Sequence, residues 1–232
     1  DTAESRAMIR LACDLHSECL GRAVSMMALI PQQPWPAGGR PAWPVLYLLH
    51  GLSDNHTIWL RRTALERYAE GGRIAIVMPD GGRSFYTDSA GLGPYWTFLS
   101  EELPARVQAL LPVSAARADT YAAGLSMGGY GAFKLALRCP DRIAAAASLS
   151  GVLDLAGYVR SLPPERKAEC RLLFGDPARI AGSDNDLIAL AARLASSSGP
   201  KPRLYQCCGT GDFLYGANQA FLQAARGAGL AI

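Results

Sequence analysis

Short apolar runs alternate with longer segments of helical period along most of this chain. The runs are rich in Val, Ile, Leu and Tyr, and they cover residues 24–31, 44–51, 73–80, 119–126, 143–151 and 203–209. The segments between them carry apolar residues at three- and four-residue steps, as amphipathic helices do, and they cover residues 57–72, 95–112, 128–140, 186–197 and 214–229. Strands and helices in this order build a mostly parallel central sheet flanked by helices, so the pattern predicts an α/β fold.

Two stretches interrupt this alternation. Residues 31–44 form a Pro- and Gly-rich turn between the first two runs, which predicts an antiparallel hairpin of 24–31 with 44–51 at one edge of the sheet. Residues 152–202 form a long irregular connection, and connections of this length usually have a function, so they are a candidate cap. No repeat or linker divides the chain, and half of its residues are apolar, which predicts a single domain over residues 1–232.

The sequence GLAI at 229–232 has the pattern of a further strand that is just beginning. It follows a predicted helix that ends at Gly227 or Gly229. In a sheet of this type the next strand would be completed and then covered by one more helix. We therefore expect a C-terminal strand and helix to be missing from this chain, through truncation or through omission of a disordered tail.

Charge and cysteine content exclude several functions. The net charge is +3 and the basic residues are scattered, so no nucleic-acid surface is predicted. No apolar stretch reaches the roughly 18 residues of a membrane span, so no membrane association is expected. The cysteines show no CxxC pair and no Cys/His ligand spacing, so no metal site is predicted. Cys207 and Cys208 would lie on opposite sides of a strand as small buried side chains, which favours free thiols and a cytoplasmic location.

Ser126 lies in a G-x-S-x-G sequence, between Gly124 and Gly128. A predicted strand precedes it and a predicted helix follows, so the serine would occupy a sharp turn whose backbone needs small residues on both sides. Such a turn exposes the hydroxyl above the sheet, and the helix directs its free N–H groups at the reacting centre. This context favours a nucleophile over a chance occurrence of the motif, and Met127 N–H would serve as one oxyanion donor.

The loop LLHGLSDN at 48–55 follows an earlier strand, where a second oxyanion donor is expected. Leu52 N–H is the candidate. Gly51 beside it would let the backbone approach the substrate, because a side chain there would obstruct it.

Asp212 follows the last complete apolar run, which suits the acid of a Ser, Asp, His order. The alternative is that Asp212 caps the helix that follows. Strand end, turn and chain order favour the catalytic role. Asp184 and Asp186 are second candidates, and both suit the capping of the helix over 186–197.

These motifs together resemble the putative-esterase (esterase D-like) branch of the α/β-hydrolases, most of all its tributyrin and acetyl esterases. The resemblance rests on LYLLHGLSDNHTIW, VMPDGGRSFYTD, EELPARVQALLP, GLSMGGYGAFKLAL and CGTGDFLY, which occur in this order over nearly the whole chain. It implies hydrolysis of small short-chain acyl esters through an acyl-enzyme, without a cofactor, and leaves a homo-oligomer open. It also implies Ser126 as nucleophile, Asp212 as triad acid, and the Leu52 and Met127 N–H groups as oxyanion hole.

Other branches and functions are alternatives. S-formylglutathione hydrolases usually carry His at the positions of Leu125 and Tyr130, and mycolyltransferase-like members lack the double glycine that begins at Gly128. Cinnamoyl and feruloyl esterases stay open, because three aromatic residues could flank an aromatic acyl group or belong to the core instead: Trp59, Tyr95 and Trp96. An acyltransferase of the same fold and a non-catalytic binding protein without a base are further alternatives.

The three histidines, His16, His50 and His56, all precede Ser126. In the resembled family the base lies on a loop after the last strand, and none of the three occupies that position. The resemblance therefore implies a catalytic histidine beyond Ile232. We interpret His50 as a structural residue, His56 as a cap or a residue lining the entrance, and His16 as a surface or core residue of an edge segment.

Overall fold

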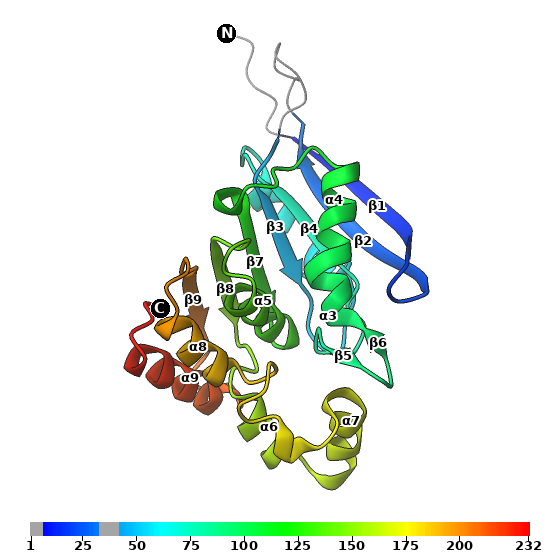
Figure 1. The fold of residues 1–232 in the computed structure, drawn as a ribbon. Helices are drawn as coiled ribbons and strands as arrows, with labels where there is room; N and C mark the ends of the chain where they lie inside the picture. Colours follow the sequence, from blue (N-terminus) through cyan, green and yellow to red (C-terminus); the bar gives the residue numbers. More distant parts are fainter. Residues whose placement is uncertain (1–6, 33–41) are drawn as a thin grey trace.

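The computed structural model describes residues 7–32 and 42–232 (Figure 1). Its main sheet has seven strands in the order β1-β2-β4-β3-β7-β8-β9. These are β1 (Met8–Ser17), β2 (Arg22–Pro31), β4 (Ala75–Pro79), β3 (Val45–Leu49), β7 (Thr120–Leu125), β8 (Ala145–Leu149) and β9 (Arg203–Cys207). From β4 to β9 the strands are parallel, whereas β2 is antiparallel to both of its neighbours. The predicted mostly parallel sheet is confirmed.

The first predicted strand pairs differently from the expectation. β2 forms a hairpin with β1, which the apolar runs did not include, and β4 lies between β2 and β3. The predicted hairpin of 24–31 with 44–51 is therefore wrong. More than ten residues separate β2 from β3, so nothing in the chain forces them to pair. The pattern of apolar positions does not predict β1, because β1 is an edge strand with several exposed polar positions, His16 among them.

Each of the five predicted helical segments contains helix. The helices are α1 (Ile58–Arg62), α2 (Leu65–Ala69), α3 (Tyr95–Thr97), the π-helix η1 (Phe98–Glu102), α4 (Leu103–Leu110), α5 (Met127–Arg138), α8 (Leu187–Ser196) and α9 (Tyr215–Gly227). The irregular turn η1 has a local cause. Pro104 has no N–H, which frees Ser100 O from its usual partner, and Arg142 Nη1 donates to that oxygen at 2.5 Å.

Helices pack on both faces of the sheet, as predicted. On one face, α1 and α2 cover β2, β4 and β3 through a small core of Leu29, Leu48, Ala69, Ile76 and Met78. On the other face, α4, α5, α8 and α9 cover the larger core, where Phe133 of α5 contacts Phe221 of α9. Phe133 and Phe221 are fully buried. The α1 and α2 side of β9 is open to solvent, where Tyr205 is 60% exposed. Ser126 lies at the carboxyl end of β7.

The interval 152–202 is mostly helical. It contains α6 (Leu155–Ser161), α7 (Pro164–Phe174), the short η3 (Pro177–Arg179) and α8. Figure 1 shows α6 and α7 beyond the carboxyl ends of the strands, near the small ribbon β5 (Asp88–Ser89) and β6 (Gly93–Pro94). A cap over the site would occupy this position.

Two sequence expectations fail at the β9 side of the molecule. Cys207 is exposed and Cys208 is half-buried, so the prediction that both are buried is wrong. On the side of the sheet that carries α1 and α2, these helices cover only β2, β4 and β3. Cys207 and Tyr205 of β9 are therefore open to solvent. Leu230–Ile232 form no strand either, because Leu230 N–H bonds back to Ala225 O at 2.9 Å and its side chain is buried.

Within the described ranges, no helix combines the length and the apolar character that crossing a bilayer requires. The six cysteines are all free thiols.

Glu102 joins the first hairpin to the helical layer. Its carboxylate accepts hydrogen bonds from Ser17 Oγ at 2.6 Å, Glu18 N–H at 2.7 Å and Cys19 N–H at 3.2 Å. Desolvation raises the pKa of this carboxyl, but the hydrogen bonds outweigh it and lower the pKa to about 2. The ionised carboxylate is therefore the form that stabilises the fold.

Glu102→Gln should lower the free energy of unfolding near neutral pH by on the order of 1 kcal/mol, because charge-assisted hydrogen bonds become neutral ones. The folded-state pKa is depressed, so the advantage of the wild-type protein is present above the ordinary glutamate pKa and disappears as the pH falls toward 2. Urea midpoints of both proteins between about pH 7 and pH 3 measure this. A difference between them that does not change with pH would contradict it.

Candidate active site

Ser126 occupies the turn between β7 and α5. Its backbone has φ 56° and ψ −116°, a left-handed conformation that costs a non-glycine residue about 1–3 kcal/mol. Ser126 N–H donates to Leu149 O of the adjacent strand at 2.9 Å, which fixes the turn against β8. The side chain is half-buried and so reaches solvent. The strand, turn and helix expected around this serine are all present.

Two glycines are required by the close approach of backbones at this turn. A Cβ at Gly124 would stand 2.3 Å from the carbonyl of Gly128, and a Cβ at Gly128 would stand 2.2 Å from Leu49 O. Both distances are far shorter than a van der Waals contact. The amino end of α5 thus packs directly on the carboxyl end of β3, and this places Ser126 beside the loop that follows β3.

That loop presents Gly51 to the serine. A Cβ on Gly51 would lie 3.7 Å from Ser126 Cβ and 3.5 Å from Leu125 O. Within the described part of the chain, neither Leu52 N–H nor Met127 N–H has a hydrogen-bond acceptor. Met127 is the first residue of α5, so its N–H also carries the positive end of the helix dipole. The two predicted oxyanion donors therefore lie on segments that adjoin Ser126, and both are available.

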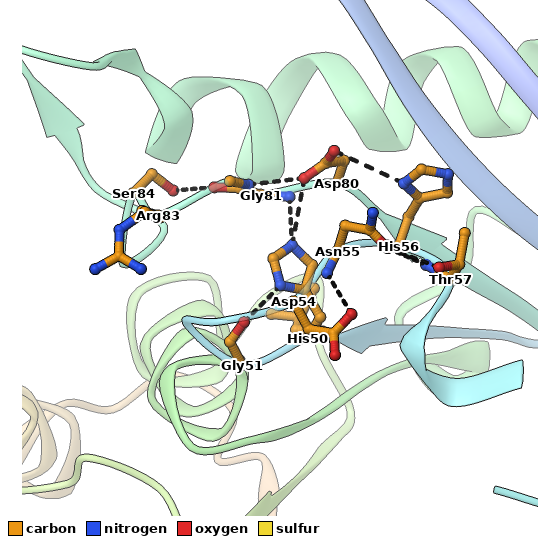
Figure 2. A network of polar contacts seen from close by, with 12 residues as sticks. His50, Gly51, Asp54, Asn55, His56, Thr57, Asp80, Gly81, Arg83 and Ser84 are labelled. Atoms are coloured by element: carbon orange, nitrogen blue, oxygen red, sulfur yellow. Dashed lines mark hydrogen bonds and ion pairs between the residues drawn. The ribbon is translucent and has the colours of Figure 1, made fainter. Parts of the chain in front are cut away.

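His50 is 1% exposed, and both of its ring nitrogens are engaged. Nδ1 lies 2.8 Å from Gly51 O, and Nε2 lies 2.8 Å from the Gly81 N–H (Figure 2). Asp80 Oδ1 is farther from Nε2, at 3.5 Å. Because both nitrogens bond to the backbone, His50 has the structural role expected of it.

His56 and His16 do not serve Ser126 either. His56 is half-buried, and its Nδ1 lies 3.7 Å from Asp80 Oδ2 on the far side of that carboxylate (Figure 2). His16 is exposed on the edge strand β1. Asp80 Oδ1 accepts the Gly82 N–H at 2.9 Å. His50 and His56 therefore lie beside Asp80, and His16 lies on the edge strand β1.

Asp212 lies in the turn between β9 and α9. Its Oδ1 accepts the Leu214 N–H at 2.8 Å, which is the capping contact of the alternative interpretation. Its Oδ2 has no hydrogen-bond partner among the described residues. One oxygen therefore holds the turn and the other is free to orient a base. Asp186 caps α8 through Ile188 N–H and Ala189 N–H.

Asp184 bonds to basic side chains and not to the elbow. Its partners are Arg138 at 3.1 Å and Arg193 at 3.2 Å. Neither of the second candidates for the triad acid, Asp184 or Asp186, is therefore placed to orient a base.

The three aromatic residues considered for substrate binding pack in the core. Tyr95 is 5% exposed and Trp96 is 9% exposed, with the Arg138 guanidinium 4.2 Å above the Trp96 ring. Trp59 is half-buried against the small core and donates from Nε1 to Leu49 O at 3.3 Å. Packing accounts for all three, so Gly51 is the predicted substrate-contact residue that the structure brings to the serine.

Tyr86 belongs to this site and was not found from the sequence. Its hydroxyl donates to His50 O at 3.0 Å, and its ring fills the space beside Gly81 and Gly131, where a Cβ would come within 2.3 and 2.4 Å of it. Its φ of 48° is unusual for a tyrosine, and no residue pattern signals it. The motif VMPDGGRSFYTD contained the residue but did not reveal its contact.

A mostly parallel sheet with helices on both faces and a serine on a sharp strand-to-helix turn defines the α/β-hydrolase fold. A substrate-bound serine hydrolase of Staphylococcus aureus, the fluorophosphonate-binding FphF, superposes with a TM-score of 0.85 at 28% identity, covering 94% of this chain and 85% of its own. The chain belongs to the family described as "Putative esterase", which matches residues 17–227. The predicted family and fold are confirmed.

Two curated relatives show the range of this family. An acetyl esterase of Caldicellulosiruptor saccharolyticus is 32% identical over 181 residues, which cover 75% of this chain and 68% of the relative. The diacylglycerol acyltransferase/mycolyltransferase Ag85B of Mycobacterium leprae is 31% identical over 250 residues, with 92% of this chain and 72% of the relative covered.

Gly128→Ala should destabilise the protein by about 3 kcal/mol or more, because the new methyl group meets the backbone of β3, which cannot move aside. Gly216→Ala in α9 is the matched control, since nothing lies within 4 Å of its added Cβ. Thermal unfolding of both variants measures the difference. Equal midpoints would show that α5 does not pack on β3 as closely as described.

Proposed function

We propose that this protein is a serine carboxylesterase that hydrolyses short-chain acyl esters through an acyl-enzyme, with Ser126 as the nucleophile. The observation that carries the proposal is the strained turn that presents Ser126 beside two unpaired N–H groups. Membership of the esterase family supports it, and the acetyl esterase relative supports a short acyl group.

The reaction follows from the geometry in two steps. A base removes the Ser126 Oγ proton, and the oxygen attacks the ester carbonyl while the N–H groups of Leu52 and Met127 bind the developing oxyanion. The alcohol leaves with the proton returned by the base. Water then attacks the acyl-enzyme by the same route and releases the carboxylic acid.

The base itself remains a prediction. Neither the buried His50, the Asp80-facing His56 nor the exposed His16 bonds to Ser126, so the expected histidine is not among them. We propose that Asp212 orients the base through its free Oδ2, because Oδ1 already holds the Leu214 N–H. A cavity of about 600 Å³ adjoins this turn between α6, α7 and α9, lined by Tyr158, Arg166 and Phe213, and it is a candidate for binding part of the ester.

An acyltransferase is the second candidate. The Ag85B relative supports it, since its match covers 92% of this chain. The acyl-enzyme would then pass its acyl group to an alcohol in place of water. Mass spectrometry of products formed with glycerol or a sugar present separates the two. A feruloyl esterase gains no support from Trp59, Tyr95 and Trp96, which pack in the core. The cytoplasmic location and the homo-oligomer remain predictions.

Ser126→Ala in the full-length protein should reduce hydrolysis of p-nitrophenyl acetate by about 10³-fold or more, because no oxygen nucleophile remains. Labelling by a fluorophosphonate probe should disappear as well. Ser196→Ala, an exposed serine of α8, is the control and should keep both properties. Unchanged turnover in the Ser126 variant would refute the nucleophile assignment.

Asp212→Asn separates the two roles of this carboxylate. An amide oxygen can still accept the Leu214 N–H, so the unfolding midpoint should change little. kcat should fall by about 10³-fold, because an amide does not stabilise a histidine cation or hold its tautomer. Loss of stability with kcat preserved would identify Asp212 as a helix cap alone.

A further inference from the structure

The contact between the His50 ring and Gly51 O determines the direction of a specific N–H group. Gly51 O and Leu52 N–H belong to the same peptide unit, and the described chain contains no cis peptide bond. In a planar trans peptide the C=O and N–H bonds point in opposite directions. A ring that holds Gly51 O at 2.8 Å on one side therefore turns Leu52 N–H to the other side. Gly51 stands against Ser126, with its Cβ position 3.7 Å from Ser126 Cβ.

The hydrogen-bond partners of His50 define its tautomer. Gly51 O can only accept, so Nδ1 carries a proton. Gly81 N–H can only donate, so Nε2 presents a lone pair. The ring is thus the neutral Nδ1–H tautomer, and it joins the loop after β3 to the loop after β4 (Figure 2).

The surroundings leave the ring no alternative orientation. It is 1% exposed and meets the edge of the Tyr86 ring at a centroid distance of 6.1 Å. The Tyr86 hydroxyl holds His50 O, the carbonyl of the preceding peptide, at 3.0 Å. Gly51 O also accepts the Asp54 N–H at 3.2 Å, so the loop is fixed from both sides. Because the His50 ring is fixed in this way, it can fix the orientation of the Gly51–Leu52 peptide that it contacts.

We propose that His50 is a positioning residue of the oxyanion hole: its Nδ1–H holds Gly51 C=O so that Leu52 N–H faces the oxygen of the carbonyl group that Ser126 attacks. This rests on the proposed esterase function and adds to it the cause of the loop geometry. His50 takes no proton from Ser126 and does not contact the substrate. It acts only by orienting the peptide between Gly51 and Leu52.

Two substitutions of His50 test its two hydrogen bonds separately, because each keeps one of them and removes the other. His50→Asn places an amide NH₂ near the Nδ1 position and keeps the donor to Gly51 O. His50→Gln places an amide oxygen near the Nε2 position and keeps the acceptor for Gly81 N–H while removing that donor. His16→Gln, on the exposed edge strand, is the control for a histidine replaced elsewhere.

We expect His50→Gln to lower kcat for p-nitrophenyl acetate by about 10²-fold with KM nearly unchanged, since an oxyanion donor acts mainly in the transition state. His50→Asn should retain kcat within about tenfold of the wild type, and His16→Gln should match it. If the Asn and Gln variants lose kcat equally, or if the Gln variant keeps wild-type kcat, the proposal is wrong. The failure of the esterase function itself would show separately, as Ser126→Ala that stays active.

A measurement on the wild-type protein tests the proposal even if a His50 variant does not fold. In ¹⁵N NMR of the histidine side chains, His50 should show a protonated Nδ1 and an unprotonated Nε2 near neutral pH. The signal is assigned by its contact with the Tyr86 ring. An Nε2–H tautomer would overturn the proposal, because Nδ1 would then carry no proton and Gly51 O would lose its donor.

Discussion

The direct contact of backbones between the amino end of α5 and the carboxyl end of β3 is the constraint on which the site depends. At Gly128 one added carbon would stand 2.2 Å from Leu49 O, so no side chain separates the helix from the strand. The first N–H groups of α5 and the loop after β3 therefore lie on either side of Ser126. The strain at Ser126 is sustained because packing on both sides leaves that turn no other path.

Buried polar contacts connect the region of the Ser126 turn to the loop before α8. Tyr86 joins the loop after β4 to His50 O, and its own carbonyl accepts from Lys134 Nζ at 3.1 Å. Lys134 is fully buried on α5 and also donates to Asn185 Oδ1 at 2.7 Å. Burial lowers the pKa of Lys134 well below its ordinary value. The helix that begins at the serine is thereby tied to the loop that precedes α8, within the region considered as a cap.

The pattern of apolar positions predicted much of this architecture because each element has its own period. β3, β4, β7, β8 and β9 all fall inside predicted runs, α8 and α9 fall inside predicted helices, and α5 begins one residue before its predicted helix. Strand pairing was less accessible. β2 and β3 are consecutive runs, yet β4 separates them, since pairing depends on contacts between distant segments. The aromatic residues near the motifs were equally ambiguous, because a tryptophan in a core and one in a pocket have the same local sequence.

Residue order alone was sufficient to identify the esterase family, the elbow at Ser126 and the candidate roles of Asp212, Leu52 and Met127. The family followed from the resemblance of several motifs in one order, which also implied the candidate roles. The elbow followed from local chemistry: a small residue on each side of a serine, a strand before it and a helix after it. Three-dimensional packing decided the rest, which includes the tautomer of His50, the support from Tyr86 and the two separate oxygens of Asp212. Each of these is a contact between segments separated along the chain or a choice between two atoms of one side chain, and neither leaves a periodic trace in the sequence.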